Sequence, residues 1–138
     1  MEEKLFTNLS PTARWIILPF ACVLAPVIVS LLVGVSILLN LGLNAEEEYP
    51  IISSLIEFSR SFGMGFVFAR AALYVAPSHT RIVMQIVRII GVCLIALFSL
   101  LLYENNLLDW KNSIHSLLML IGILIRLDDE SEIIEEFD

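Results

Sequence analysis

The sequence predicts an all-α integral membrane protein, with about four transmembrane helices in an antiparallel bundle and a short acidic cytoplasmic tail. The 138-residue chain is 58% hydrophobic and only 17% charged, whereas soluble domains are nearer half apolar and a quarter charged. Because a chain this short exposes much of its surface after folding, most of that surface must face lipid. In addition, long uncharged segments alternate with short polar connections, which is the pattern of successive membrane crossings.

The first predicted span covers residues 15–43. No charged residue lies between Trp15 and Ala45, a stretch of 31 residues. A straight helix of that length would measure roughly 46 Å, against about 30 Å for the hydrocarbon core of a bilayer. Ser10 followed by Pro11 marks the helix start, because serine caps free amide groups and proline is tolerated in the first turn.

Two prolines interrupt the hydrogen-bond pattern of this span. Pro19 and Pro26 lie seven residues apart, and each removes one hydrogen bond from the helix. We therefore expect either a kink near Pro26 or an interfacial segment up to about Ala25, followed by the span proper.

The second predicted span, residues 51–76, follows a hydrophilic break that ends at Pro50. It is the least apolar span, because it contains Glu57, Arg60 and Arg70. Either the whole segment is one tilted helix, or the part up to about Arg60 lies in the outer interface. The cost of burying Glu57 and Arg60 in lipid favours the second arrangement. These two side chains are three residues apart and can neutralise each other on a helix.

The third and fourth spans are predicted at residues 81–103 and 107–127. The turn at 77–80 is so short that the second and third spans must be antiparallel neighbours. Another short polar connection precedes the fourth span, and four crossings place both termini on the same side. Residues 1–127 thus form a single transmembrane domain, followed by the acidic tail at 128–138.

The distribution of basic residues predicts the orientation, because lysine and arginine beside short loops favour the cytoplasmic side. With a cytoplasmic N-terminus, the inner side carries most of the basic residues and the outer side carries the run from Glu46 to Glu48. The inner residues are Lys4, Arg14, Arg81 and Arg126, with Arg70 and Arg88 deeper, and the outer ones are Lys111 and, near the membrane, Arg60. We therefore expect a multi-pass protein of the cell membrane with both termini in the cytoplasm.

The acidity of the chain lies in residues 128–138. This segment has seven acidic residues and no basic one, which leaves eight of each elsewhere and accounts for the net charge of -7. No basic stripe remains for nucleic acid, so nucleic-acid binding is not expected. Ile133, Ile134 and Phe137 recur among the acids at helix-compatible spacing. They predict a partner-docking segment, with a disordered, solvated tail as the alternative.

Residues that could carry catalysis or bind a metal are few. His79 and His115 are expected near opposite faces of the membrane, too far apart to share a metal. Cys22 and Cys93 lie within apolar segments, where a thiol behaves as a small hydrophobic group. No serine stands in a Gly-x-Ser-x-Gly motif. The sequence therefore predicts no catalytic residue, no metal site, no cofactor and no enzymatic activity.

Three arginines near the inner side form a candidate contact site. Arg70 and Arg88 lie eight and ten residues from the turn at Ser78, which places both at roughly 12 to 15 Å of depth in straight helices. Arg81 and Arg88 are seven residues apart and share a helix face. We expect them to contact an anionic lipid headgroup, acidic groups of a partner, or permeating anions. The alternative is that their side chains extend to lipid phosphates at the interface.

A stripe of small residues marks one face of the second span. Ser61, Gly65 and Ala69 recur every four residues, the pattern that lets membrane helices approach until their backbones touch. The stripe predicts close helix packing, either within the chain or between copies in an oligomer.

Together these features favour a non-enzymatic assembly or interaction subunit. We expect a homo-oligomer, or a complex with a larger membrane or cytoplasmic partner that the tail helps to dock. The alternative is an oligomeric pore that permeabilises the membrane and is lined by the polar face of the second span.

Overall fold

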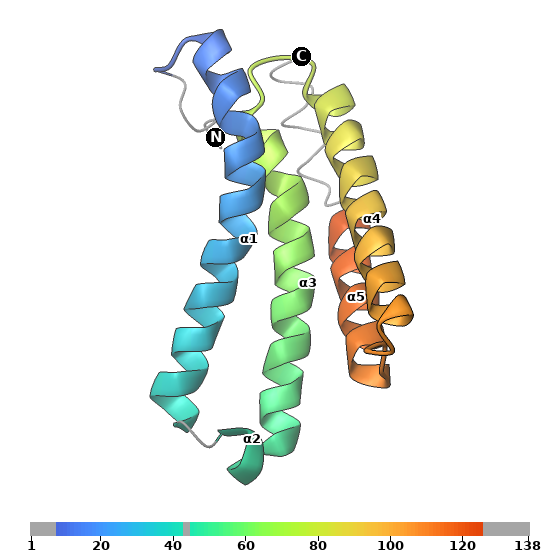
Figure 1. The fold of residues 1–138 in the computed structure, drawn as a ribbon. Coiled ribbons are helices and arrows are strands. Elements are labelled where there is room, and N and C mark those ends of the chain that lie inside the picture. The colour runs from blue at the N-terminus through green and yellow to red at the C-terminus, as the bar shows by residue number, and fades with distance from the viewer. Residues whose placement is uncertain (1–7, 43–44, 126–138) are drawn as a thin grey trace.

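The computed structural model describes residues 8–42 and 45–125, and the regular elements in these ranges are all helices (Figure 1). Four long helices and one short one follow each other along the chain. Their bounds are α1 Pro11–Leu41, α2 Ala45–Glu48, α3 Pro50–Val75, α4 Thr80–Glu104 and α5 Trp110–Leu124. The prediction of an all-helical protein is confirmed over the described ranges.

Three of these helices are long and apolar enough to cross a membrane, namely α1 over Pro11–Asn40, α3 and α4. The helix α5 has 15 residues, or about 22 Å, which is less than the roughly 30 Å of a hydrocarbon core. The predicted fourth span at 107–127 is thus helical only from Trp110 within the described residues, and its last two residues lie outside them. Asp109 sets this later start, because its carboxylate accepts a hydrogen bond from the Asn112 amide at 2.8 Å and caps the helix.

Local signals at the helix starts act as the sequence predicts. The Ser10 hydroxyl accepts a hydrogen bond from the Ala13 amide at 3.3 Å, and Pro11 occupies the first turn of α1. Pro50 likewise opens α3. At the turn between α3 and α4, His79 has a positive φ of 52° immediately before the first residue of α4.

Both helices with ambiguous predictions are continuous. The helix α3 runs from Pro50 to Val75 as a single element, so the charged residues of its first half belong to the same helix as the apolar second half. The helix α1 contains Pro19 and Pro26 and continues through both.

The helix α3 occupies the centre of the bundle and packs against α1, α4 and α5 (Figure 1). In contrast, α1 packs against α3 and makes no comparable backbone approach to α4 or α5 in the described residues. The best-buried side chains, Leu73, Thr80 and Met84, surround the α3–α4 turn, and Leu18 and Cys22 of α1 pack against the same cluster.

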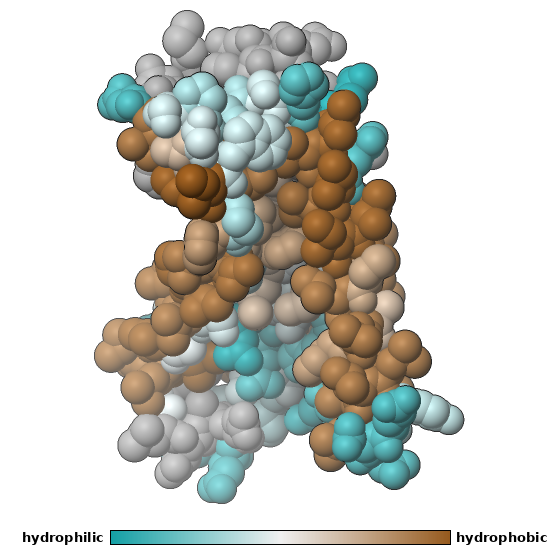
Figure 2. Space-filling model, turned by 45° about the horizontal axis from the view of Figure 1, so that its top comes forward, coloured by the Kyte–Doolittle hydropathy of each residue, from teal (hydrophilic) through white to brown (hydrophobic). Residues whose placement is uncertain are grey.

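The outer surface of the helices is apolar. Side chains such as Phe20, Leu31 and Leu39 of α1 are more than 60% exposed, and hydrophobic residues cover much of the sides of the molecule in Figure 2. Monomeric soluble proteins rarely expose apolar patches of such extent. The three apolar helices therefore support a membrane protein.

Candidate functional site

A polar cavity of about 600 Å³ lies between α3, α4 and α5, in the half of the bundle away from the α3–α4 turn. Its apolar wall is contributed mainly by α4. The polar groups come from α3 and α5, and they are Glu57, Arg60, Ser61, Asn112, His115 and Ser116. A cavity of this size with a few convergent polar groups is typical of ligand-binding sites.

A side-chain hydrogen bond joins α3 to α5 in this cavity. Ser61 Oγ lies 2.6 Å from His115 Nδ1, and the Phe58 ring packs against the imidazole at a centroid distance of 5.0 Å. Ser61 Oγ also lies 3.3 Å from the Glu57 carbonyl oxygen. The hydroxyl can donate its one proton to this carbonyl and accept from His115 Nδ1 when that nitrogen is protonated, so the two contacts are compatible. This bond holds the ring of His115 against α3.

Glu57 and Arg60 line the same cavity but are not paired with each other. Both side chains are half-buried. In the part of the chain that the structure describes, no salt bridge joins them or involves either one. The mutual neutralisation expected from their spacing is therefore not observed within the described residues.

Two members of the small-residue stripe, Ser61 and Gly65, pack within the chain on α5. Ser61 and Ala69 are buried, and a methyl group added to Gly65 would lie 2.9 Å from the carbonyl carbon of Met119. On the facing helix, a methyl group on Gly122 would lie 2.8 Å from the Phe66 amide nitrogen. Glycine on each helix thus lets the two backbones touch, which is the intrachain form of the predicted packing.

Two buried arginines cap the ends of neighbouring helices. Arg88 donates from Nε to the Ile123 carbonyl at 3.1 Å and from Nη2 to the Ile125 carbonyl at 3.4 Å, at the end of α5. Arg14 donates in the same way to the carbonyls of Val75 and Ala76, both at 3.1 Å, at the end of α3. The last carbonyls of a helix lack intrahelical donors and carry partial negative charge. Both guanidinium groups therefore stabilise helix ends.

The candidate arginine site is divided between different surroundings. The Arg70 guanidinium lies 5.2 Å from the Phe66 ring centroid and contacts Tyr74, beside an apolar cavity of about 480 Å³ between α1 and α3. Arg88 instead reaches the end of α5. Arg81, in the first turn of α4, is exposed. These contacts place Arg70 beside the α1–α3 cavity and Arg88 at the end of α5.

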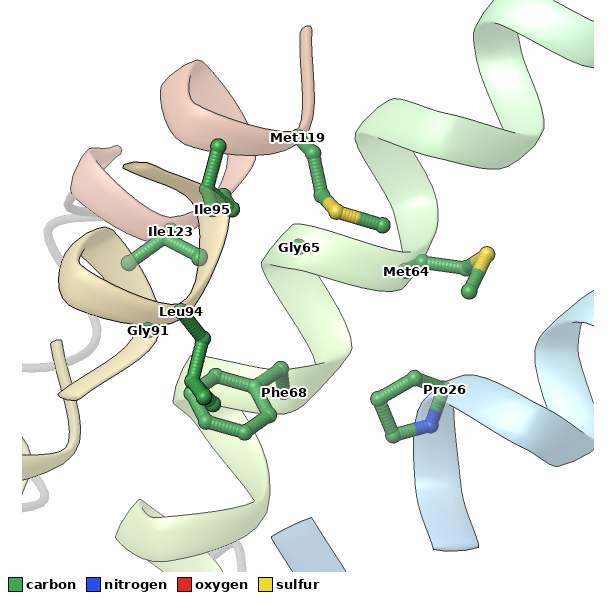
Figure 3. Close-up of a pocket in the computed structure, with 9 residues that line it drawn as sticks. All are labelled: Pro26, Met64, Gly65, Phe68, Gly91, Leu94, Ile95, Met119 and Ile123. Atoms are coloured by element: carbon green, nitrogen blue, oxygen red, sulfur yellow. The ribbon is translucent and has the colours of Figure 1, made fainter. Parts of the chain in front are cut away.

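The polar cavity continues into a smaller apolar cavity of about 120 Å³ (Figure 3). The side chains of Met64, Leu94, Ile95 and Met119 border both. Figure 3 shows that Phe68 of α3 and Pro26 of α1 also line the small cavity. The apolar space thus extends from the polar groups toward α1.

A wider apolar groove of about 620 Å³ lies between α1 and α4, with Phe68 of α3 at its floor. It lies where the backbone of α1 approaches α3 but not α4. Its walls include Trp15, Pro19 and Cys22 of α1 and the face of α4 that runs from Ile82 to Leu94.

The remaining predicted site residues give no further centre. Ile133, Ile134 and Phe137 lie outside the described residues. Within 8–42 and 45–125, no group of three or more His, Cys, Asp or Glu residues is placed to hold a metal ion. Cys22 and Cys93 are free thiols.

No protein-family model, curated protein or solved structure matches the chain.

Proposed function

We propose that this chain is a non-enzymatic subunit of a membrane assembly, and that a helix of another chain docks in the groove between α1 and α4. The supporting observation is that, within the described residues, the backbone of α1 approaches only one other long helix, and an apolar groove of about 620 Å³ lies beside it. Along α4 the groove extends from Ile82 to Leu94, or about 18 Å, which is room for more than three turns of a docked helix.

The prolines of α1 favour a protein helix over lipid as the occupant. Pro19 has no N–H for the Trp15 carbonyl, and Pro26 has none for the Cys22 carbonyl. Trp15, Pro19 and Cys22 all line the groove. Any carbonyl that this loss of a donor leaves unpaired is costly in hydrocarbon, and an acyl chain carries no donor. A hydroxyl or amide side chain on a docked helix supplies one.

The docked helix belongs either to a second copy, which makes the chain a homo-oligomer, or to a larger membrane protein. In this proposal the tail adds a second contact, in which Ile133, Ile134 and Phe137 dock on a cytoplasmic surface of the partner.

Substitution of Ile86 by tryptophan is expected to weaken association at least about tenfold, or about 1.4 kcal/mol. Ile86 lines the groove and is 50% exposed, so the larger ring fills the space that the docked helix needs. Ile89→Trp is the matched control, because Ile89 is 64% exposed on the same helix and does not line the groove. The measurements are the detergent-corrected mass by light scattering and the recovery of partners from native membranes.

Equal assembly of the two tryptophan variants would show that the groove faces lipid. A parallel comparison of the full chain with a chain lacking residues 128–138 separates the contribution of the tail from that of the groove.

The second candidate is an oligomeric pore, and the polar cavity is the observation that favours it. Glu57, Arg60 and Ser61 of α3 line this cavity, but α4 and α5 of the same chain form its other walls. The backbone contact at Gly65 closes α3 against α5 next to it. Conduction would require these helices to part, so the geometry gives stronger support to the subunit. Ion flux into liposomes containing the purified chain distinguishes the two.

We also propose that α5 crosses the membrane as a fourth span and that both termini lie in the cytoplasm, at the cell membrane. The capping residue Arg14 and the exposed Arg81 lie at the end of the bundle that contains the α3–α4 turn. Glu47, Glu48 and Asp109 lie at the other end. This asymmetry supports the turn as the cytoplasmic end.

Reporter fusions after Glu47 and Asp109 are therefore expected to report the outside, and fusions after Ser78 and Asp138 the inside. The measurement is the ratio of a periplasm- or exterior-active reporter to a cytoplasm-active one at each site. An external signal from Ser78 would reverse the orientation, and an external signal from both Asp109 and Asp138 would remove the fourth crossing.

A further inference from the structure

We propose that the polar cavity between α3, α4 and α5 binds a phospholipid whose headgroup carries a primary ammonium group together with its phosphate. This site is separate from the groove between α1 and α4 and does not depend on the proposed assembly. Its volume of about 600 Å³ lies within the range of small-molecule sites, about 300 to 1,000 Å³.

Two opposite charges define the headgroup. Glu57 and Arg60 both line the cavity and are half-buried, and within residues 8–42 and 45–125 neither side chain forms a salt bridge or a hydrogen bond. Charged groups in a membrane are costly unless they are paired. A ligand with an ammonium and a phosphate supplies a partner to each, whereas a singly charged ligand leaves one charge without a partner.

The chemistry of the carboxylate selects the type of ammonium. Glu57 can accept charge-assisted hydrogen bonds, and a primary ammonium has N–H donors to give. A quaternary ammonium has none and is recognised instead by a cage of aromatic rings. The cavity is lined by one phenylalanine, Phe98, and not by such a cage. Ethanolamine-type headgroups therefore fit better than choline-type ones.

The rest of the cavity fits the neutral parts of such a lipid. Ser61, His115 and Ser116 offer polar groups near the charges, while Met64, Leu94, Ile95 and Met119 lead into the adjoining apolar cavity (Figure 3). That direction is suited to an acyl chain.

The site is also accessible from the bilayer at a suitable depth. Leu94 and Phe98 line the cavity and are 54% and 58% exposed, so the α4 wall borders lipid and allows sideways entry. Glu57 is seven residues from the start of α3, or about 10 Å along the helix axis. The helix as a whole is roughly 9 Å longer than the hydrocarbon core is thick. The carboxylate therefore lies close to the headgroup region.

The test is native mass spectrometry of the full chain in detergent, titrated with phosphatidylethanolamine, phosphatidylcholine and phosphatidylglycerol of identical acyl chains. We expect phosphatidylethanolamine to bind about tenfold more tightly than either of the others, as for one additional charge-assisted hydrogen bond. Glu57→Gln is expected to remove the preference for phosphatidylethanolamine over phosphatidylcholine. Arg60→Gln is expected to weaken the binding of both of these lipids. The matched controls are Glu104→Gln and Lys111→Gln, which change exposed charges outside the cavity.

Equal binding of the three lipids by the unaltered chain, or a preference that survives Glu57→Gln, would overturn the proposal. Free phosphoethanolamine at the same concentration should not displace the lipid, because it lacks the acyl chains, and full displacement would indicate a site for a soluble zwitterion instead. Thermal unfolding of each variant shows whether it is folded. If Glu57→Gln does not fold, the comparison of headgroups on the unaltered chain decides the question.

Discussion

Alanine at Gly65 is expected to lower the free energy of unfolding by about 1 to 3 kcal/mol, although alanine is the better helix former. The added methyl group would lie 2.9 Å from the Met119 carbonyl carbon and closer still to its oxygen. These are backbone atoms, which cannot rotate away as a side chain can. The substitution therefore forces α3 and α5 apart. This separation also opens the facing contact at Gly122 and loosens the bond between Ser61 and His115.

Two other glycines provide matched controls for Gly65→Ala. A methyl group on Gly63 would meet Val29 Cγ1 at 3.6 Å, an ordinary contact, and one on Gly34 would meet nothing within 4 Å. Alanine at either position is expected to be neutral or to stabilise the helix by up to about 1 kcal/mol. Thermal unfolding followed by circular dichroism in one detergent ranks the three variants. If Gly65→Ala were as stable as Gly63→Ala, α5 could not be seated on α3 as described.

Loss of the Arg88 cap is expected to cost about 3 kcal/mol in Arg88→Met. Arg88 is 8% exposed, and its guanidinium donates to two carbonyls at the end of α5. Methionine keeps much of the apolar stem but leaves both carbonyls without this donor. Arg88→Lys should fall between, because a single ammonium cannot reproduce the two directed bonds of the guanidinium.

The control for Arg88→Met is Gln85→Met, which replaces an exposed polar side chain three residues away on the same helix. Surface substitutions of this kind usually change stability by less than about 0.5 kcal/mol. Hydrogen exchange should locate the damage, with faster exchange in the last turn of α5 in Arg88→Met than in the control. Uniformly faster exchange without an effect at this turn would contradict a capping role.

Local signals made much of the fold predictable from the sequence. A serine before Pro11 and a proline at position 50 each mark the start of a helix, because capping and the fixed φ of proline act within one turn. The length of α5 was less predictable. Apolar residues continue on both sides of it, so hydropathy alone does not detect the cap at Asp109 that delays its start.

The candidate site depends on contacts between distant segments, which explains why it was mostly missed. Ser61 and His115 are 54 residues apart, and Arg14 is 61 residues from the first carbonyl that it caps. No local motif marks such pairs. The stripe at Gly65 was recognised from its spacing, but its partner was not, because the glycine at 122 is isolated on its own helix. The charges at Glu57 and Arg60 were noted, and their spacing suggested pairing rather than a shared cavity.

The central position of α3 restricts how the two ends of the molecule can influence each other. Since the backbone of α1 approaches α3 and not α4 or α5 in the described residues, a change at the polar cavity reaches the groove beside α1 mainly by displacing α3 or the side chains that both spaces share. Phe68 and Leu94 are such side chains, because they border the groove and the small apolar cavity. Communication between a bound lipid and a docked helix would therefore be mechanical and short in range. A more rigid contact at Phe68 and Leu94 would uncouple lipid binding from helix docking and leave each of them intact.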